Sequence, residues 1–177
     1  MAKLTFYGAT AGVTGSTYLL ETDKATVLLD CGLYQGSREE EKANEEPFPF
    51  DIHKIDAVVL SHAHLDHSGR LPKLFADGYS GRIYMTYPTS ELLEIMLKDA
   101  ASLQQRDTEW ENKRRRRAGK KEIEPLYDIE DVESALSSCD GFPYGARHEI
   151  AEGVEVCFRD AGHILGSSIV EIFVTEA

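Results

Sequence analysis

Three histidines and an aspartate fall within the six positions from His62 to His67, in the stretch SHAHLDHSG. The stretch directly follows AVVL at 57–60, a continuous apolar run that is typical of a strand buried on both faces. The edge at which such strands end is where α/β sheets bind ligands. The segment therefore predicts an α/β fold with a polar site at the edge of its sheet.

The spacing of these residues predicts a metal site in two parts. His62 and His64 are two positions apart, so in extended chain both imidazoles point the same way and can reach one ion. Asp66 and His67 follow after the chain turns, which makes them ligands for a second, neighbouring ion. Imidazole and carboxylate without thiolate favour zinc, with iron and manganese as competitors. The alternative is a polar loop between a strand and a helix, but four specified residues in six positions favour the metal site.

Two residues elsewhere in the chain belong with this cluster. Asp30 ends the apolar run TVLLD, so it can lie beside the histidines, although a carboxylate in a strand-end turn is an equal alternative. His163 lies in DAGHILGSS, a glycine-flanked turn between two apolar strands. A single histidine there is usually a hydrogen-bonded turn residue. Beside the incomplete pair of His62 and His64, it is predicted to be the third imidazole.

The hydrophobic pattern predicts one mixed α/β domain over residues 1–177. A long helix is expected from an N-cap at Thr89 past Trp110 to Gly119, and a shorter helix from near Asp128. Strands are expected at 3–7, 16–21, 26–30, 57–60, 81–86, 153–161 and 167–175.

The charge balance argues mildly against nucleic-acid binding by the chain as a whole. There are 31 acidic and 19 basic residues, so the formal net charge is −12. The strong cationic feature is a run between 113 and 121. It predicts a loop that guides nucleic acid near the entrance of a cleft, or alternatively a solvated helix end, where the helix dipole also favours cations. The residues assigned to nucleic-acid contact are Arg114, Arg115, Arg116 and Arg117.

Composition also limits the compartment. No apolar run approaches the 18 residues of a membrane span, and the start MAKLTFYGAT is typical of a first strand rather than a signal peptide. The three cysteines, Cys31, Cys139 and Cys157, are odd in number and scattered, which argues against a disulfide framework. We therefore expect a cytoplasmic protein with no membrane contact.

Five segments together resemble the metallo-β-lactamase fold over residues 3 to 175. More narrowly, the chain resembles the β-CASP branch of RNA- and DNA-processing nucleases, which includes the cleavage and polyadenylation specificity endonucleases. The H-x-H-x-D-H pattern marks only the superfamily, whereas DCGLYQG and AGHILGS favour the nuclease branch. The five segments are DCGLYQG, LSHAHLDHSGRLPKL, MTYPTSELLEIMLKDA, PLYDIEDVESAL and DAGHILGSS.

The resemblance implies a role for each matching residue. His62, His64 and His163 would be ligands of one zinc, and Asp66 and His67 would hold the other. Asp30 matches the first-motif aspartate of the family, which supports the ligand loop by hydrogen bonding. Asp66 and Asp30 are thus the two carboxylates of the catalytic machinery.

The resemblance also implies an αββα sandwich and a hydrolase that cleaves RNA, or DNA, through a metal-activated hydroxide. The bridging aspartate, the later histidines and the inserted β-CASP domain of the family are absent from this sequence. We therefore expect the amino-terminal portion of the fold, with an incomplete second sheet and a weakened second metal site. Such a chain alone is expected to be inactive and to self-associate through unpaired strands.

Two other classes of function remain as alternatives. One is a small-molecule hydrolase of the same fold that acts on thioesters or lactones; the nuclease-branch segments and the basic run count against it. The other is a non-catalytic fragment that binds RNA or a partner. Intact ligand motifs count against this reading, whereas the absent aspartate favours it.

Overall fold

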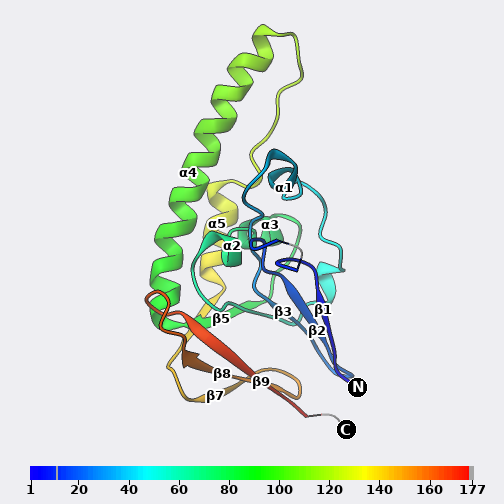
Figure 1. Cartoon of the computed structure of the whole chain (residues 1–177), viewed down its shortest axis with the longest axis vertical. Helices are drawn as coiled ribbons and strands as arrows, with labels where there is room; N and C mark the ends of the chain where they lie inside the picture. The colour runs from blue at the N-terminus through cyan, green and yellow to red at the C-terminus, as the bar shows by residue number, and fades with distance from the viewer. Residues whose placement is uncertain (11, 176–177) are drawn as a thin grey trace.

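The computed structural model describes residues 1–10 and 12–175, and it has three layers (Figure 1). A six-stranded sheet lies in the middle, helices cover one of its faces, and a three-stranded sheet packs on the other. The mixed α/β class predicted from the sequence is confirmed. The predicted domain ends at 177, but residues 176–177 lie outside the described part of the chain.

The first sheet has the strand order β1-β2-β3-β4-β5-β6, with antiparallel pairing up to β3 and parallel pairing from there on. The second sheet is antiparallel in the order β7-β8-β9. The strands are β1 Lys3–Phe6, β2 Tyr18–Glu21, β3 Thr26–Leu29, β4 Ala57–Val59, β5 Arg82–Thr86, β6 Cys139–Phe142, β7 Arg147–Ala151, β8 Val154–Asp160 and β9 Ser168–Val174.

Alternating residues of the central strands divide the core into two parts, because successive side chains point to opposite faces. Leu28 and Val58 face the helices, where Leu74 and Leu93 pack on them. Val27 faces the second sheet, where its neighbours include Phe158. The helices are α1 Arg38–Lys42, η1 Ile52–Lys54, α2 Leu65–Ser68, α3 Leu71–Ala76, α4 Tyr87–Arg117 and α5 Ile129–Ser137.

The helix ends follow local sequence signals, with one error in the prediction. α4 ends at Arg117, and Gly119 beyond it has a left-handed φ of 64°, as expected of a helix stop. α5 begins at Ile129 with Asp128 as its N-cap, which agrees with the predicted helix start near Asp128. The N-cap of α4 is Thr86 and not Thr89, because the Thr86 hydroxyl accepts the Thr89 backbone N–H and Pro88 fits the first turn.

Strands β6 and β7 were not predicted. β6 reads CDGF, and Asp-Gly is ordinarily a turn signal. Here Gly141 pairs with β5, and the Tyr87 ring lies so close that a Cβ at this position would be 2.5 Å from its Cδ1. β7 reads RHEIA, which has too few apolar residues to stand out. Both segments therefore form strands because of their pairing with a neighbouring strand and not because of their own sequence pattern.

The outer half of α4 leaves the body of the molecule (Figure 1). All five buried residues of this helix lie between Thr89 and Ala101. We call residues 102–125, the outer half and the segment that returns from it, the arm. Two hydrogen bonds between Asn112 and the backbone of Ile123, at 2.8 and 2.9 Å, join the two sides of the arm.

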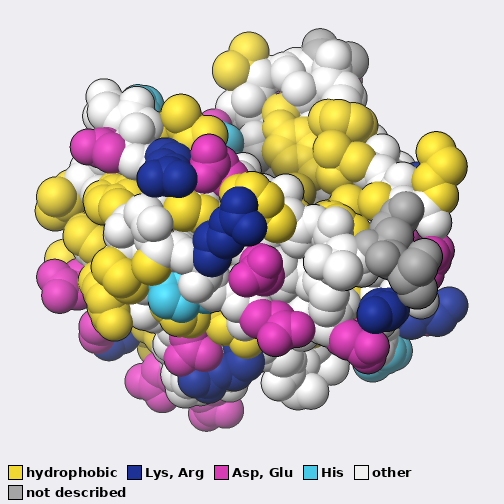
Figure 2. Space-filling view, turned by 90° about the horizontal axis from the view of Figure 1, so that it is seen from below, with side chains coloured by type: hydrophobic (Ala, Val, Ile, Leu, Met, Phe, Trp, Pro, Cys, Tyr) yellow, Lys and Arg dark blue, Asp and Glu magenta, His cyan; other side chains and the backbone are white. Residues whose placement is uncertain are grey.

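The face on the side of the second sheet carries charges of both signs between separate groups of hydrophobic side chains (Figure 2). Leu4 and Phe6 of β1, on the sheet face that carries the second core cluster, remain 46% and 56% exposed. Within the described residues, β9 pairs only with β8. No helix in that part of the chain is long and apolar enough to cross a membrane.

Candidate metal centre

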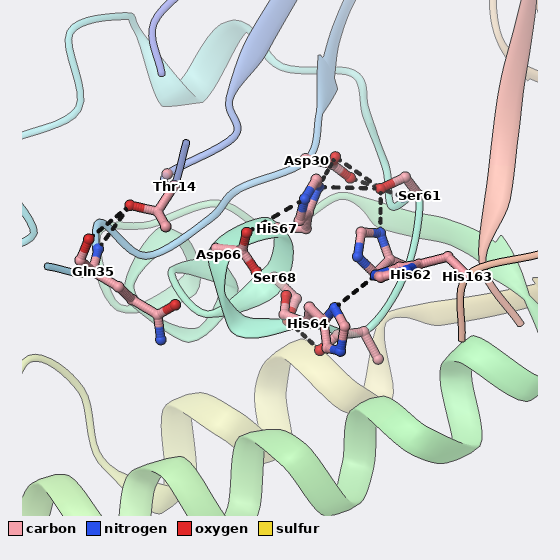
Figure 3. A network of polar contacts seen from close by, with 12 residues as sticks. Thr14, Asp30, Gln35, Ser61, His62, His64, Asp66, His67, Ser68 and His163 are labelled. Atoms are coloured by element: carbon pink, nitrogen blue, oxygen red, sulfur yellow. Dashed lines mark hydrogen bonds and ion pairs between the residues drawn. The ribbon is translucent and has the colours of Figure 1, made fainter. Parts of the chain in front are cut away.

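The residues of the predicted site converge at the end of β4 (Figure 3). His62 follows the strand after a two-residue step, and His64 is the N-cap residue of α2. Asp66 and His67 lie within that short helix. His163 reaches the same place from the turn between β8 and β9, which we call the His163 turn (residues 161–167).

Three imidazoles form the centre of the site. His62, His64 and His163 each offer one ligand nitrogen, and these atoms all lie within 4.8 Å of one another. His163 Nε2 is 3.2 Å from His64 Nδ1. Two ligands of a tetrahedral zinc ion with Zn–N distances of about 2.0–2.1 Å are separated by roughly 3.3 Å. The donor set and its spacing therefore fit a divalent metal ion.

Asp66 and His67 lie beside this group and form a separate pair. His67 Nε2 is 3.6 Å from Asp66 Oδ2, and the His67 ring centroid is 4.1 Å from that of His62. The structure thus brings together all five predicted ligands, three in one group and two next to it. The ligand roles themselves stay predictions.

Asp30 lies beside His67 and Ser61 and binds the ligand loop. It is 5% exposed, and its Oδ2 is 2.7 Å from His67 Nδ1. Its carboxylate also accepts the backbone N–H and the hydroxyl of Ser61, both at 2.8 Å. The residue has a left-handed φ of 55°, which non-glycine residues adopt rarely and at a cost. This strained conformation delivers the carboxylate to the histidines.

Ser61 is a site residue that the sequence interpretation missed. Its hydroxyl donates to Asp30 and lies 3.0 Å from His62 Nδ1, so it connects the carboxylate to a second histidine. A carboxylate accepts hydrogen bonds only, so His67 carries its proton on Nδ1. The single Ser61 proton is used toward Asp30, so His62 Nδ1 donates to Ser61. In the neutral form of each ring, the Nε2 lone pair is then free.

The His163 turn is fixed to the first sheet and to α4. The carbonyl of Gly166 accepts hydrogen bonds from the hydroxyls of Thr86 and Thr89, at 2.7 and 2.8 Å. Ser168 donates its backbone N–H to the Ser61 carbonyl at 2.9 Å. A Cβ at Gly166 would lie 2.4 Å from the Thr89 nitrogen, so this approach requires glycine. These contacts hold the third imidazole against the other two.

The protonation of two histidines follows from their surroundings. Burial, with the charge of His67 as the next cause, lowers the pKa of His62 to about 4. A neutral imidazole is the form that binds metal. Burial alone would lower the pKa of His67 as well, but the hydrogen bond and charge of Asp30, with the charge of Asp66, raise it.

The basic run lies away from the metal centre. Arg114 to Arg117 occupy the last turn of α4, at the tip of the arm (Figure 1). α4 is close to α2 at Ala100, because Ala100 and Leu65 of α2 line one groove. Arg115 lies 15 residues further along the helix, which corresponds to about 22 Å. At the tip, Arg114 lies over the Trp110 ring, and Arg116 pairs with Glu122 at 3.4 Å. RNA contact by this run stays a prediction.

The chain is similar in sequence to curated proteins that are longer. It is 42% identical over 164 residues to Ribonuclease TTHA0252 from Thermus thermophilus, which covers 93% of this chain and 33% of that protein. It is 32% identical over 173 residues to the Transcription termination factor FttA from Methanococcus maripaludis, which covers 97% of this chain and 25% of that protein. The chain spans about a third or less of the length of these relatives.

Solved structures support the fold. A metallo-beta-lactamase with a HARLDQ motif from Cronobacter sakazakii is similar with a TM-score of 0.51 and 20% identity, over 91% of this chain and 49% of that one. The metallo-beta-lactamase fold protein YhfI from Bacillus subtilis matches with a TM-score of 0.51 and 18% identity, over 97% of this chain and 57% of that one. The model of the metallo-beta-lactamase superfamily domain matches residues 19–177. With this match, the layered fold and the histidine cluster at the sheet edge, the chain belongs to the metallo-beta-lactamase superfamily.

Proposed function

We propose that this chain is the metal-binding part of a zinc-dependent ribonuclease of the β-CASP branch, which hydrolyses the phosphodiester bonds of RNA. The observation that carries the proposal is the convergence of His62, His64 and His163 beside Asp66 and His67. A relative named ribonuclease, 42% identical over nearly the whole chain, supports the substrate class.

Each part of the site has its own task in this proposal. His62, His64 and His163 would hold one zinc ion, while Asp66 and His67 would contribute to a second. When bound, the ions supply positive charge that lowers the pKa of water and stabilises negative charge on the phosphate oxygens. Asp30 and Ser61 keep protons on Nδ1 of His67 and His62, so that both Nε2 lone pairs face the site.

We also propose that the arm contacts RNA at a distance from the metal centre. Arg114 to Arg117 concentrate positive charge at its tip, in a chain whose formal net charge is −12. Phosphate contacts by arginine provide affinity that depends on salt and not on sequence. The arm would therefore hold flanking RNA and leave the chemistry to the histidine cluster.

The experiment uses the purified chain and two histidine variants. We expect zinc to bind the unsubstituted protein and His53→Ala, because His53 is exposed and outside the cluster, and to be lost in His163→Ala. Labelled RNA, DNA of the same sequence and a thioester are then assayed with and without chelator, and light scattering measures self-association. A protein that binds no zinc, iron or manganese after reconstitution would contradict the metal centre. Chelator-sensitive cleavage of the thioester alone would contradict the ribonuclease.

A further inference from the structure

Arg70 is a buried cation next to α2, the metal-ligand helix that carries the predicted ligands Asp66 and His67. It is 3% exposed and is the N-cap residue of α3, three positions after His67. Its Nε donates to the Gly32 carbonyl at 2.7 Å, and its Nη2 donates to the Thr17 hydroxyl at 3.0 Å. One planar guanidinium thus joins two loops that are far apart in the sequence.

The charge of Arg70 is not balanced by an ion pair in the described part of the chain. Aromatic rings face the guanidinium instead, and its carbon is 4.8 Å from the ring centroid of Tyr34 and 5.1 Å from that of Phe48. Burial of a charge is costly, and a lone buried cation is rarely the most stable choice for a core position. The hydrogen bonds of Arg70 therefore point to a geometric role.

The two loops that Arg70 joins hold the backbone of the metal-ligand helix. The Ser16 N–H donates to the Asp66 carbonyl at 2.9 Å, and the Cys31 N–H donates to the His67 carbonyl at 2.7 Å. The two loops also bind each other, because the Gly32 N–H donates to the Ser16 carbonyl at 2.9 Å. A Cβ at Gly32 would lie 1.7 Å from the Asp66 oxygen, so any shift of this loop reaches Asp66 directly.

We propose that Arg70 is a positioning residue for the metal centre. It holds the loops of Thr17 and Gly32 together, and through their amides it fixes the backbone of α2 and thus the direction of its ligands. This inference rests on the proposed metal-binding function. Lysine cannot replace it, because a single ammonium lacks the planar fork that reaches both acceptors.

The test compares Arg70→Lys and Arg70→Met with Lys73→Met. Lys73 is the matched control, because it is also buried, lies one turn further along α3 and also faces the Phe48 ring. Zinc affinity is measured by chelator competition. We expect both Arg70 variants to bind zinc about 10-fold or more weakly, as removal of an outer hydrogen-bond partner does elsewhere, while Lys73→Met binds within twofold of the unsubstituted chain.

A second measurement does not depend on metal. Amide hydrogen exchange of the metal-free protein reports on the Ser16 and Cys31 N–H groups, which we expect to exchange at least about 10-fold faster in the Arg70 variants only. Unchanged exchange there would overturn the inference. Faster exchange with unchanged zinc affinity would also overturn it, because Arg70 would then only support the fold. Absence of zinc binding by the unsubstituted chain would instead overturn the proposed function, and the exchange result would still decide whether Arg70 holds the loops.

Discussion

Replacement of Asp30 by asparagine reverses the hydrogen bonds beneath the histidines and leaves the shape of the residue unchanged. The amide oxygen of the new side chain can still accept the Ser61 backbone N–H, whereas its NH2 group would face His67 Nδ1 and the Ser61 hydroxyl. His67 must then accept on Nδ1 and carry its proton on Nε2. The Ser61 proton turns toward His62 and shifts that ring to the same tautomer. Asparagine also tolerates the left-handed φ, so no new strain is added.

The size of the effect follows from the number of ligands involved. Two of the five predicted ligands lose their free Nε2 lone pair, and loss of one such outer partner typically weakens metal binding 10- to 100-fold. We therefore expect zinc affinity to fall by at least about 100-fold, which corresponds to about 2.7 kcal/mol. The free energy of unfolding of the metal-free protein should fall by about 1–3 kcal/mol, because charged hydrogen bonds become neutral ones.

Two measurements test this reasoning. Chelator competition gives the zinc affinity, and nitrogen chemical shifts of the histidine rings give the tautomer in metal-free protein. Asp56→Asn is the matched control, because Asp56 accepts the Thr26 N–H at 2.8 Å just before the other end of β4. If Asp30→Asn keeps its zinc affinity within twofold, or keeps the Nδ1 proton on His67, the proposed hydrogen-bond direction is refuted.

Three further predictions concern other parts of the chain. Gly32→Ala should lower the free energy of unfolding by at least about 2 kcal/mol in urea titrations, because its Cβ would lie 1.7 Å from the backbone carbonyl oxygen of Asp66. A stable variant with normal zinc affinity would show that the loops can separate. Burial raises the pKa of Cys31 from 9.0 to about 12 and that of Tyr127 from 10.0 to about 12. The unfolded chain therefore releases these protons at lower pH than the folded chain, and the free energy of unfolding should fall as the pH rises from about 9 toward 12. Urea midpoints measured at pH 8 and 10.5 check this expectation. Replacement of Arg114 to Arg117 by glutamine should weaken RNA binding and flatten its salt dependence by up to about 0.7 per lost phosphate contact, with zinc content unchanged; binding that keeps its salt slope would assign the run to a solvated helix end.

The sequence was sufficient for the features that depend on local pattern. The apolar run before His62 and the alternate spacing of His62 and His64 predict a strand that ends in a pair of ligands facing one way. The start of α5 near Asp128 and the stop of α4 at Gly119 are also local signals. His163 could be predicted for a different reason. A glycine-flanked histidine between apolar strands is a natural third ligand when another segment supplies an incomplete ligand pair.

What could not be predicted depends on contacts between distant segments. Ser61 joins Asp30 to His62 only after β3 and β4 pair in parallel, and serine before a histidine carries no signal of its own. Arg70 reads as a surface cation in sequence, and only the packing of the loops of Thr17 and Gly32 buries it. The basic run was expected near a cleft, and the length of α4 is what carries it to the tip of the arm.

The uneven burial along α4 has a consequence for how this chain can vary. Its buried side chains lie between Thr89 and Ala101, whereas hydrogen bonds between Asn112 and Ile123 join the two sides of the arm beyond. Deletion or insertion of about seven residues of the helix, close to two turns, together with about three residues of the extended returning segment, keeps the same helix face toward that segment. Arm length can therefore change in evolution or by design without disturbing the histidines. In a series of such variants, zinc affinity should stay constant while the reach of the basic tip changes by about 10 Å per step.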